Sequence, residues 1–234
     1  MVSAVVVAAG KGTRMKADIN KQYLELSERP IVYWTIERFM QNEYIDEVIA
    51  VIVKEEEGLF KEKVAPFLSN TKPLKIAYGG LERKDSVQNG LFMTDDDCEI
   101  VIIHDGVRPF FTKEDVENVI EGAKAWDGCI VGVPVKDTIK VLGEDFIVEN
   151  TPRRNTLFAV HTPQAFRKER LIKAYKECEE KSYEQIPTDD ASVVEITGGK
   201  VKAVLGSYSN IKITTPEDLA LASQIMKDYL DIKK

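Results

Sequence analysis

The residues best suited to chemistry lie in one glycine-rich segment near the amino terminus, between Val2 and Tyr23. An apolar, β-branched run from Val5 to Val7 predicts a buried strand, and the small residues after it predict a tight turn. The small residues are Ala8, Ala9, Gly10 and Gly12. Glycine lets backbone N–H groups approach a phosphate closely. The cations of the segment are Lys11, Arg14, Lys16 and Lys21. Together these features predict a cradle for a triphosphate.

Two common phosphate-binding motifs do not match this segment. A Walker A loop ends in Gly-Lys-Ser/Thr, whereas residues 10–13 read Gly-Lys-Gly-Thr. A dinucleotide-binding fingerprint requires glycine or alanine where this chain has Met15. The alternative to a phosphate site is an ordinary turn between a strand and a helix, with solvated lysines.

A second glycine pair, Gly79 and Gly80, follows a predicted strand at 74–78. The pair permits close approach of the backbone to a ligand. Arg83 and Ser86 come just after it and can donate hydrogen bonds to a base or a ribose. The alternative is a structural one, in which Asp85 or Ser86 only caps the helix that follows.

Asp105 directly follows another predicted strand, at 99–104. A carboxylate at that edge of the sheet, opposite a phosphate loop, is a candidate ligand for Mg²⁺, which prefers one or two carboxylates plus phosphate oxygens. The alternative is that Asp105 caps a turn or pairs with Arg108. We expect His104 to be a packed histidine rather than a catalytic one.

Residues 136–155 break the alternation of strands and helices. Apolar residues alternate on either side of a Leu-Gly-Glu-Asp turn, which predicts a β-hairpin. Because an isolated hairpin is only marginally stable, we expect it to pack on a second subunit, or alternatively on its own domain. Arg153 and Arg154 close it, and on a strand they would point to opposite faces, so that one of them could bind a phosphomonoester.

Two further polar residues have weaker local signals. Lys212 lies between Ile211 and Ile213, a strand-like alternation that could simply direct the lysine to solvent. Thr162 lies in the segment HTPQAF, where a threonine can serve merely as a turn hydroxyl.

The elements that must position these residues form a regular series. Strands are expected at 5–7, 48–53, 74–78, 99–104, 129–135 and 201–205. Helices are expected at 31–41, 55–67, 86–93, 113–125, 168–180 and 189–197, with a last helix that begins after Thr215. Thr112 is the expected N-cap of helix 113–125, with Asp115 completing a capping box. This alternation predicts an α/β, Rossmann-like three-layer sandwich with a mostly parallel sheet and a protruding hairpin arm, in one domain spanning 1–234.

The composition narrows the class of protein. A chain of 234 residues suits one α/β domain. No apolar run approaches the roughly 20 residues of a membrane helix, and there is no signal-peptide pattern. The three cysteines are widely spaced, which predicts reduced thiols and a cytoplasmic location. The net charge of −7 argues against nonspecific binding of nucleic acid.

Five separated motifs carry a resemblance to a known family: AAGKGTRM with KQY, GGLERKDSV, HDGVRPF, HTPQAF and SNIKITTPEDL. They resemble nucleotidyltransferases that activate sugar and polyol phosphates, most closely the 2-C-methyl-D-erythritol 4-phosphate cytidylyltransferase family. The resemblance extends from Ala4 to Leu221. It implies transfer of a cytidylyl group from CTP to the polyol phosphate, release of pyrophosphate, a magnesium cofactor and a role in isoprenoid synthesis by the non-mevalonate pathway. It also implies a homodimer in which the hairpin crosses to the neighbouring subunit.

The resemblance also implies roles for individual residues. Those near the α-phosphate and its developing charge are Arg14, Lys21 and Lys212. Those that bind CTP are Ala8, Ala9, Gly10, Gly12, Gly80, Arg83, Ser86 and Asp105, with Asp105 also the metal ligand. Those that bind the polyol phosphate are Thr138, Arg154, Thr162 and Arg108. Residues 188–192 match a family stretch that we expect to be structural.

The chain departs from the family pattern at Leu81 and Ser209, where an acidic residue is usual. The nearest alternative activity is that of a ribitol 5-phosphate cytidylyltransferase. An alternative of another class is a nucleotide-binding module without turnover, although binding alone does not require three cations at the α-phosphate.

Overall fold

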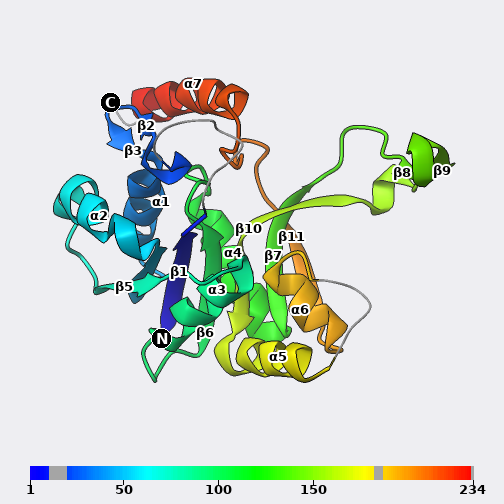
Figure 1. Cartoon of the computed structure of the whole chain (residues 1–234), viewed down its shortest axis with the longest axis horizontal. Coiled ribbons are helices and arrows are strands. Elements are labelled where there is room, and N and C mark those ends of the chain that lie inside the picture. Colours follow the sequence, from blue (N-terminus) through cyan, green and yellow to red (C-terminus); the bar gives the residue numbers. More distant parts are fainter. Residues whose placement is uncertain (11–19, 182–186, 233–234) are drawn as a thin grey trace.

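A seven-stranded mixed sheet forms the centre of the computed structural model, which describes residues 1–10, 20–181 and 187–232 (Figure 1). Its strands are β1 (Val2–Ala8), β4 (Glu47–Ile52), β5 (Leu74–Tyr78), β6 (Ile100–Asp105), β7 (Gly128–Pro134), β10 (Phe158–Arg167) and β11 (Val201–Leu205). Their spatial order is β11-β7-β10-β6-β1-β4-β5. Two short pairs lie outside this sheet: β2 (Glu25–Leu26) with β3 (Arg29–Pro30), and β8 (Val141–Leu142) with β9 (Val148–Asn150).

Helices cover both faces of the sheet. They are α1 (Ile31–Met40), α2 (Glu57–Lys63), α3 (Arg83–Phe92), α4 (Lys113–Ala125), α5 (Lys168–Glu180), α6 (Asp190–Ile196) and α7 (Pro216–Ile232). Alternate residues of β1 divide the core, as a buried strand requires. Ala4 and Val6 pack with α1, α2 and α4, whereas Val5 packs with α3, α5 and α6. Helix α7 packs on a third apolar cluster with Leu26 and Phe110. The predicted three layers are therefore confirmed.

The register of the parallel strands determines where the site can form. Ala8 of β1 lies opposite Ile52 of β4, and Val7 lies opposite Asp105 of β6. Strands β1, β4, β5 and β6 run parallel, so their carboxyl ends meet at one edge. Ligands of open α/β sheets bind at such an edge.

Strand β10 is the main element that the sequence analysis missed. It runs antiparallel between β6 and β7, so the sheet is not parallel throughout. The sequence did not indicate this strand because it contains Pro163, and proline has no N–H to donate to the hydrogen bonds between strands. In the structure the register shifts between Val160 and Gln164, and Pro163 lies at that interruption, where the ladder does not need its donor.

One predicted helix is interrupted in the structure, and one residue predicted to lie on a strand lies on a turn. The helix expected at 55–67 is divided into a 3₁₀ turn (Lys54–Glu56), α2, and a second 3₁₀ turn (Ala65–Phe67) that contains Pro66. Arg154 does not lie on a strand as expected, because it begins a 3₁₀ turn (Arg154–Thr156). The capping box of Thr112 with Asp115 and the expected hairpin are both confirmed.

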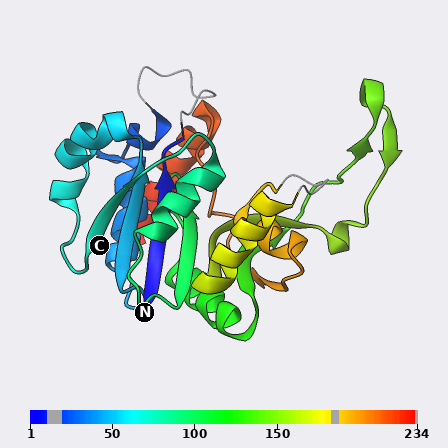
Figure 2. The same cartoon turned by 60° about the horizontal axis from the view of Figure 1, so that its bottom comes forward.

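The hairpin reaches far from the body of the molecule in both views (Figures 1 and 2). Its tip is a 3₁₀ turn (Glu144–Phe146), and Phe146 is 86% exposed. Within the described ranges, no helix combines the length and the apolar character that a membrane span needs.

Candidate functional site

A cavity of about 320 Å³ lies at the carboxyl edge of the sheet. It is lined by Ala8, Ala9, Gly10, Lys21, Gly80, Arg83, Ser86, Asp105 and Lys212, among others. All nine were predicted site residues, and they come from five separate segments of the chain. A larger hollow of about 820 Å³ lies at the opposite edge, near Met1 and Glu99, but none of the predicted site residues lines it. Convergence of charged groups, rather than volume, therefore identifies the candidate site.

Asp105 is the electrostatic centre of this cavity. Its buried carboxylate lies 3.0 Å from Lys212 Nζ, 3.2 Å from Arg108 Nε and 3.9 Å from Arg83 Nε. Burial alone would raise the pKa of Asp105, but Lys212, Arg83 and Arg108 together hold it well below its ordinary value. The carboxylate is therefore ionised at neutral pH, and the three cations are held around it.

A network of hydrogen bonds fixes these groups. Asn210 is fully buried, donates from Nδ2 to the carbonyl of Thr162 (2.9 Å) and accepts from Arg108 Nη1 at its own carbonyl (2.8 Å). The hydroxyl of Thr162 accepts the backbone N–H of Asp105 (3.1 Å). Lys212 follows Asn210 by two residues in an irregular segment, not on the expected strand. Anchoring of Asn210 therefore directs Lys212 to Asp105 instead of to solvent.

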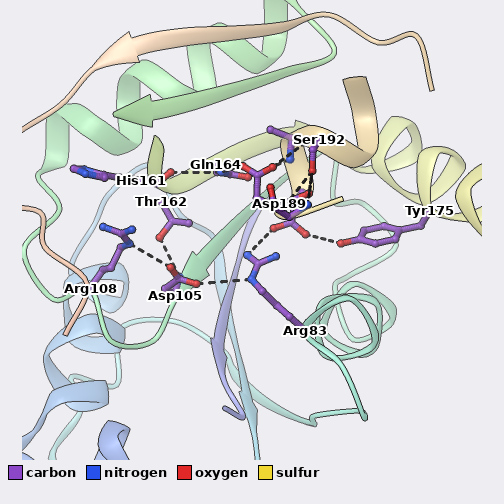
Figure 3. A network of polar contacts seen from close by, with 12 residues as sticks. Arg83, Asp105, Arg108, His161, Thr162, Gln164, Tyr175, Asp189 and Ser192 are labelled. Carbon is purple, nitrogen blue, oxygen red and sulfur yellow. Dashed lines mark hydrogen bonds and ion pairs between the residues drawn. The ribbon is translucent and has the colours of Figure 1, made fainter. Parts of the chain in front are cut away.

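Arg83 connects the cavity to helix α6. Its Nη2 lies 2.7 Å from Asp190 Oδ2, and the hydroxyl of Tyr175 donates to Asp190 Oδ1 (2.5 Å). Figure 3 shows Arg83 between Asp105 and the group of residues around Asp189 and Tyr175. Gln164 of β10 donates to Asp189 Oδ2 (2.7 Å), which ties the start of α6 to the sheet. Residues 188–192 were expected to be structural, and nothing local in the sequence predicts this ion pair.

Gly79 packs tightly against the first loop, and Gly80 packs against Asp85. A Cβ on Gly79 would lie 2.3 Å from the Cβ of Ala9, so only glycine fits. Ser86 Oγ accepts the N–H of Gly80 (3.1 Å) and thereby holds this loop. Helix α3 is capped by Glu82 and Asp85, so the structural alternative is correct for Asp85.

Lys21 lies on a 3₁₀ turn (Lys21–Tyr23), and the residues on either side of it bond to Glu56. Asn20 Nδ2 and Gln22 Nε2 donate to the two carboxylate oxygens of Glu56, the second at 3.2 Å. The residues on either side of Lys21 are thus anchored, and Lys21 lines the cavity. Glu56 is a second group that the sequence analysis missed, since nothing local relates it to Lys21.

A second cavity of about 440 Å³ adjoins the first, because Arg83, Asp105 and Lys212 line both. Arg108 and Thr162, which were predicted to bind substrate, line this second cavity. So does His161, and burial together with nearby Arg108 lowers the pKa of this histidine to about 4. His161 is therefore neutral at pH 7. His104, in contrast, is fully buried against Phe39 and Phe111, as expected for a packed histidine.

Two predicted residues, Gly12 and Arg14, lie outside the described residues, and two others lie away from both cavities. Thr138 and Arg154 are exposed on the hairpin arm, and Arg154 donates to the carbonyl of Lys136 (3.0 Å). Neither lines one of the two cavities.

The donor set near Asp105 suits a metal that arrives with phosphates. In the described part of the chain, no cluster of three or more His, Cys, Asp or Glu side chains could hold a metal ion by itself. Mg²⁺ does not need one, because it binds through one or two carboxylates plus phosphate oxygens. An ionised Asp105 between the two cavities fits that requirement.

Comparison with known proteins identifies the family. Residues 2–228 match the profile of the 2-C-methyl-D-erythritol 4-phosphate cytidylyltransferase family. Curated proteins of that name from Caldanaerobacter subterraneus and Clostridioides difficile are 47% and 48% identical to this chain. Each alignment covers 97% of this chain, and it covers 99% and 94% of the respective relatives.

Solved structures agree with the sequence relatives. The crystal structure of 4-diphosphocytidyl-2C-methyl-D-erythritol synthase from Anaerococcus prevotii is 34% identical and superposes with a TM-score of 0.84. This match covers 97% of this chain and 96% of that one. On the evidence of its sequence and its fold, the chain belongs to the 2-C-methyl-D-erythritol 4-phosphate cytidylyltransferase family.

Proposed function

We propose that the two adjoining cavities are the nucleotide and polyol sides of a cytidylyltransferase centre. The enzyme transfers the cytidylyl group of CTP to 2-C-methyl-D-erythritol 4-phosphate. A phosphate oxygen of the polyol phosphate attacks the α-phosphorus in line, the bond to the β-phosphate oxygen breaks, and pyrophosphate leaves. The observation that carries this proposal is that Arg83, Asp105 and Lys212 stand where the two cavities join.

The chemistry needs positioning and charge neutralisation rather than a nucleophilic side chain. The attacking phosphate oxygen is already ionised near neutral pH, so no general base is required. Lys212 and Lys21 line the nucleotide cavity and stabilise the charge that develops at the α-phosphorus. Arg14 remains a predicted third cation for the same phosphate. Ala8, Ala9, Gly10 and Gly80 supply backbone around the triphosphate, and Gly12 remains predicted for this role.

Asp105, with phosphate oxygens, would hold Mg²⁺, which supplies charge neutralisation at the triphosphate when bound. Arg83 and Ser86 lie on the nucleotide side, although Ser86 already bonds to Gly80. Arg108 and Thr162 lie on the polyol side, and both also hold Asp105 in place. Their predicted contact with substrate would therefore add to a structural role.

A homodimer would complete the polyol side. The arm at 136–155 exposes Phe146 (86%) and Ile147 (67%), which is more apolar surface than an isolated hairpin can support. In a dimer, the arm of one subunit would bring Thr138 and Arg154 to the second cavity of the other. We also infer one nucleotidyltransferase domain spanning 1–234 and a cytoplasmic location, which the three unpaired cysteines support.

Pyrophosphate release from CTP tests the proposal directly. It should occur with 2-C-methyl-D-erythritol 4-phosphate and Mg²⁺, and not with ribitol 5-phosphate or in excess chelator. Release with ribitol 5-phosphate alone would instead support the alternative activity. Binding of CTP without release for any polyol phosphate would leave only a nucleotide-binding module.

A further inference from the structure

Asp190 is an unusual residue to find in the core. It is 0% exposed, and its two carboxylate oxygens face different partners: Oδ2 lies 2.7 Å from Arg83 Nη2, and Oδ1 accepts from the Tyr175 hydroxyl at 2.5 Å. A buried ion pair is a poor source of stability, because desolvation of both charges offsets most of their attraction. The position of Arg83 suggests that its ion pair with Asp190 has a role other than stability.

Arg83 lies between two carboxylates but is held mainly by one. Its Nη2 is 2.7 Å from Asp190, whereas its Nε is 3.9 Å from Asp105. The side chain is 33% exposed and borders both the nucleotide cavity and the polyol cavity. Since the guanidinium is a rigid planar fork, fixing one of its nitrogens restricts the directions of the others. Without the negative charge of Asp190, Arg83 would be drawn toward Asp105 and into the space between the cavities.

Asp190 is held both through its neighbours and directly. Gln164 Oε1 accepts the N–H of Ala191 (3.3 Å), and its Nε2 donates to Asp189, which anchors the start of α6 to β10. The carboxylate of Asp190 itself accepts from the Tyr175 hydroxyl of α5. Burial, followed by the charge of Asp190, raises the pKa of Tyr175 well above its ordinary value, so its hydroxyl keeps the proton that it donates. Figure 3 shows Tyr175 and Gln164 approaching this group from different elements.

We propose that Asp190 and Tyr175 are positioning residues for this enzyme, which orient the guanidinium of Arg83 for the bound nucleotide. Neither residue touches the reacting atoms, and both act through Arg83. The inference rests on the proposed function, and the experiment must distinguish the two.

Tyr175→Phe is the sharpest variant, because it removes only the hydroxyl that holds Asp190. It should lower kcat/KM for CTP about tenfold, the scale of one hydrogen bond to a charged group. Asp190→Asn should lower it further, since the charge is lost as well. Tyr78→Phe is the matched control: it also removes a tyrosine bond to a carboxylate, that of Glu57 (2.8 Å), but away from both cavities, and it should leave kcat/KM unchanged.

A double-mutant cycle separates positioning from stability. In an Arg83→Ala background, Tyr175→Phe should change kcat/KM and the Kd for CTP by less than about twofold, because the group through which it acts is gone. An equal loss in both backgrounds, or no loss in the wild-type background, would overturn the positioning role. A wild-type protein that releases no pyrophosphate from CTP would instead overturn the proposed function. Melting temperatures identify any variant that fails to fold. The Kd for CTP of the folded variants then decides whether Tyr175 acts through Arg83.

Discussion

Asp105→Asn removes the carboxylate that contacts Lys212, Arg108 and Arg83, at almost constant volume. Breaking a buried ion pair on one side typically costs about 3–5 kcal/mol. Lys212 is 37% exposed and can regain water, so we expect the lower end, about 3 kcal/mol. For a chain of this size, that loss lowers the melting temperature by roughly 6–12 °C.

The same variant should respond to anions in a way that the wild type does not. With Asp105 neutral, three cations face each other, and a phosphate can take the place of the carboxylate. Inorganic phosphate at 100 times its Kd would restore about 2.7 kcal/mol. We therefore expect phosphate, or CTP without metal, to raise the melting temperature of Asp105→Asn more than that of the wild type. Metal-dependent turnover should be lost, because the proposed ligand of Mg²⁺ is gone.

The pH dependence gives an independent check. The folded protein depresses the pKa of Asp105, so its stabilising contribution is complete above the ordinary pKa and is lost as the pH falls toward the depressed one. The free energy of unfolding should differ between wild type and Asp105→Asn by a constant amount above about pH 5, and the difference should shrink below about pH 4. Asp96→Asn, at an exposed site, serves as the control. Equal melting temperatures for Asp105→Asn and wild type, or no added response to phosphate, would refute the reasoning.

Three other changes test separate parts of the site. Lys212→Ala should reduce kcat about 10²–10³-fold while the melting temperature changes little, because Asp105 keeps its arginine partners; near-normal turnover would exclude the assigned role. Glu56→Gln should lower kcat by weakening the anchor behind Lys21, whereas Glu55→Gln, at an exposed neighbour, should not; equal rates in steady-state assays would contradict the anchor. Phe146→Ser should shift the mass measured by light scattering from dimer toward monomer, and an unchanged mass would rule out packing of the arm tip between subunits.

Local patterns predicted the parts of this fold that local physics determines. The apolar run at Val5 to Val7, the capping box of Thr112 with Asp115 and the hairpin each depend on residues within a few positions of one another. Strand β10 could not be predicted in the same way. Pro163 argues against a strand locally, and only the pairing with β6 and β7, which are distant in sequence, shows that its missing donor is harmless.

The same distinction between neighbouring and distant residues applies to the candidate site. Residue types and spacing identified Asp105 and Arg83 as candidates, the family resemblance added Lys212, and the structure brings the three together. Apart from Arg108, which lies three residues after Asp105 and pairs with it, the partners of these residues carried no local signal. Arg108 donates to the carbonyl of Asn210, 102 positions away, and Arg83 pairs with Asp190 from a helix that the sequence analysis treated as structural.

These distant partners explain how an acidic chain can bind a polyanion. The net charge is −7, so cations that were free to move would be neutralised by whichever carboxylates lay nearest. Here Arg83 and Arg108 are each held by a buried partner in a defined direction, Asp190 for the first and the carbonyl of Asn210 for the second. Charges that are fixed before the ligand arrives need little reorganisation when the phosphates bind, and this is the condition under which electrostatic stabilisation is most effective. If that holds, weakening Asp190 should impair nucleotide binding even though every residue that touches CTP is still present.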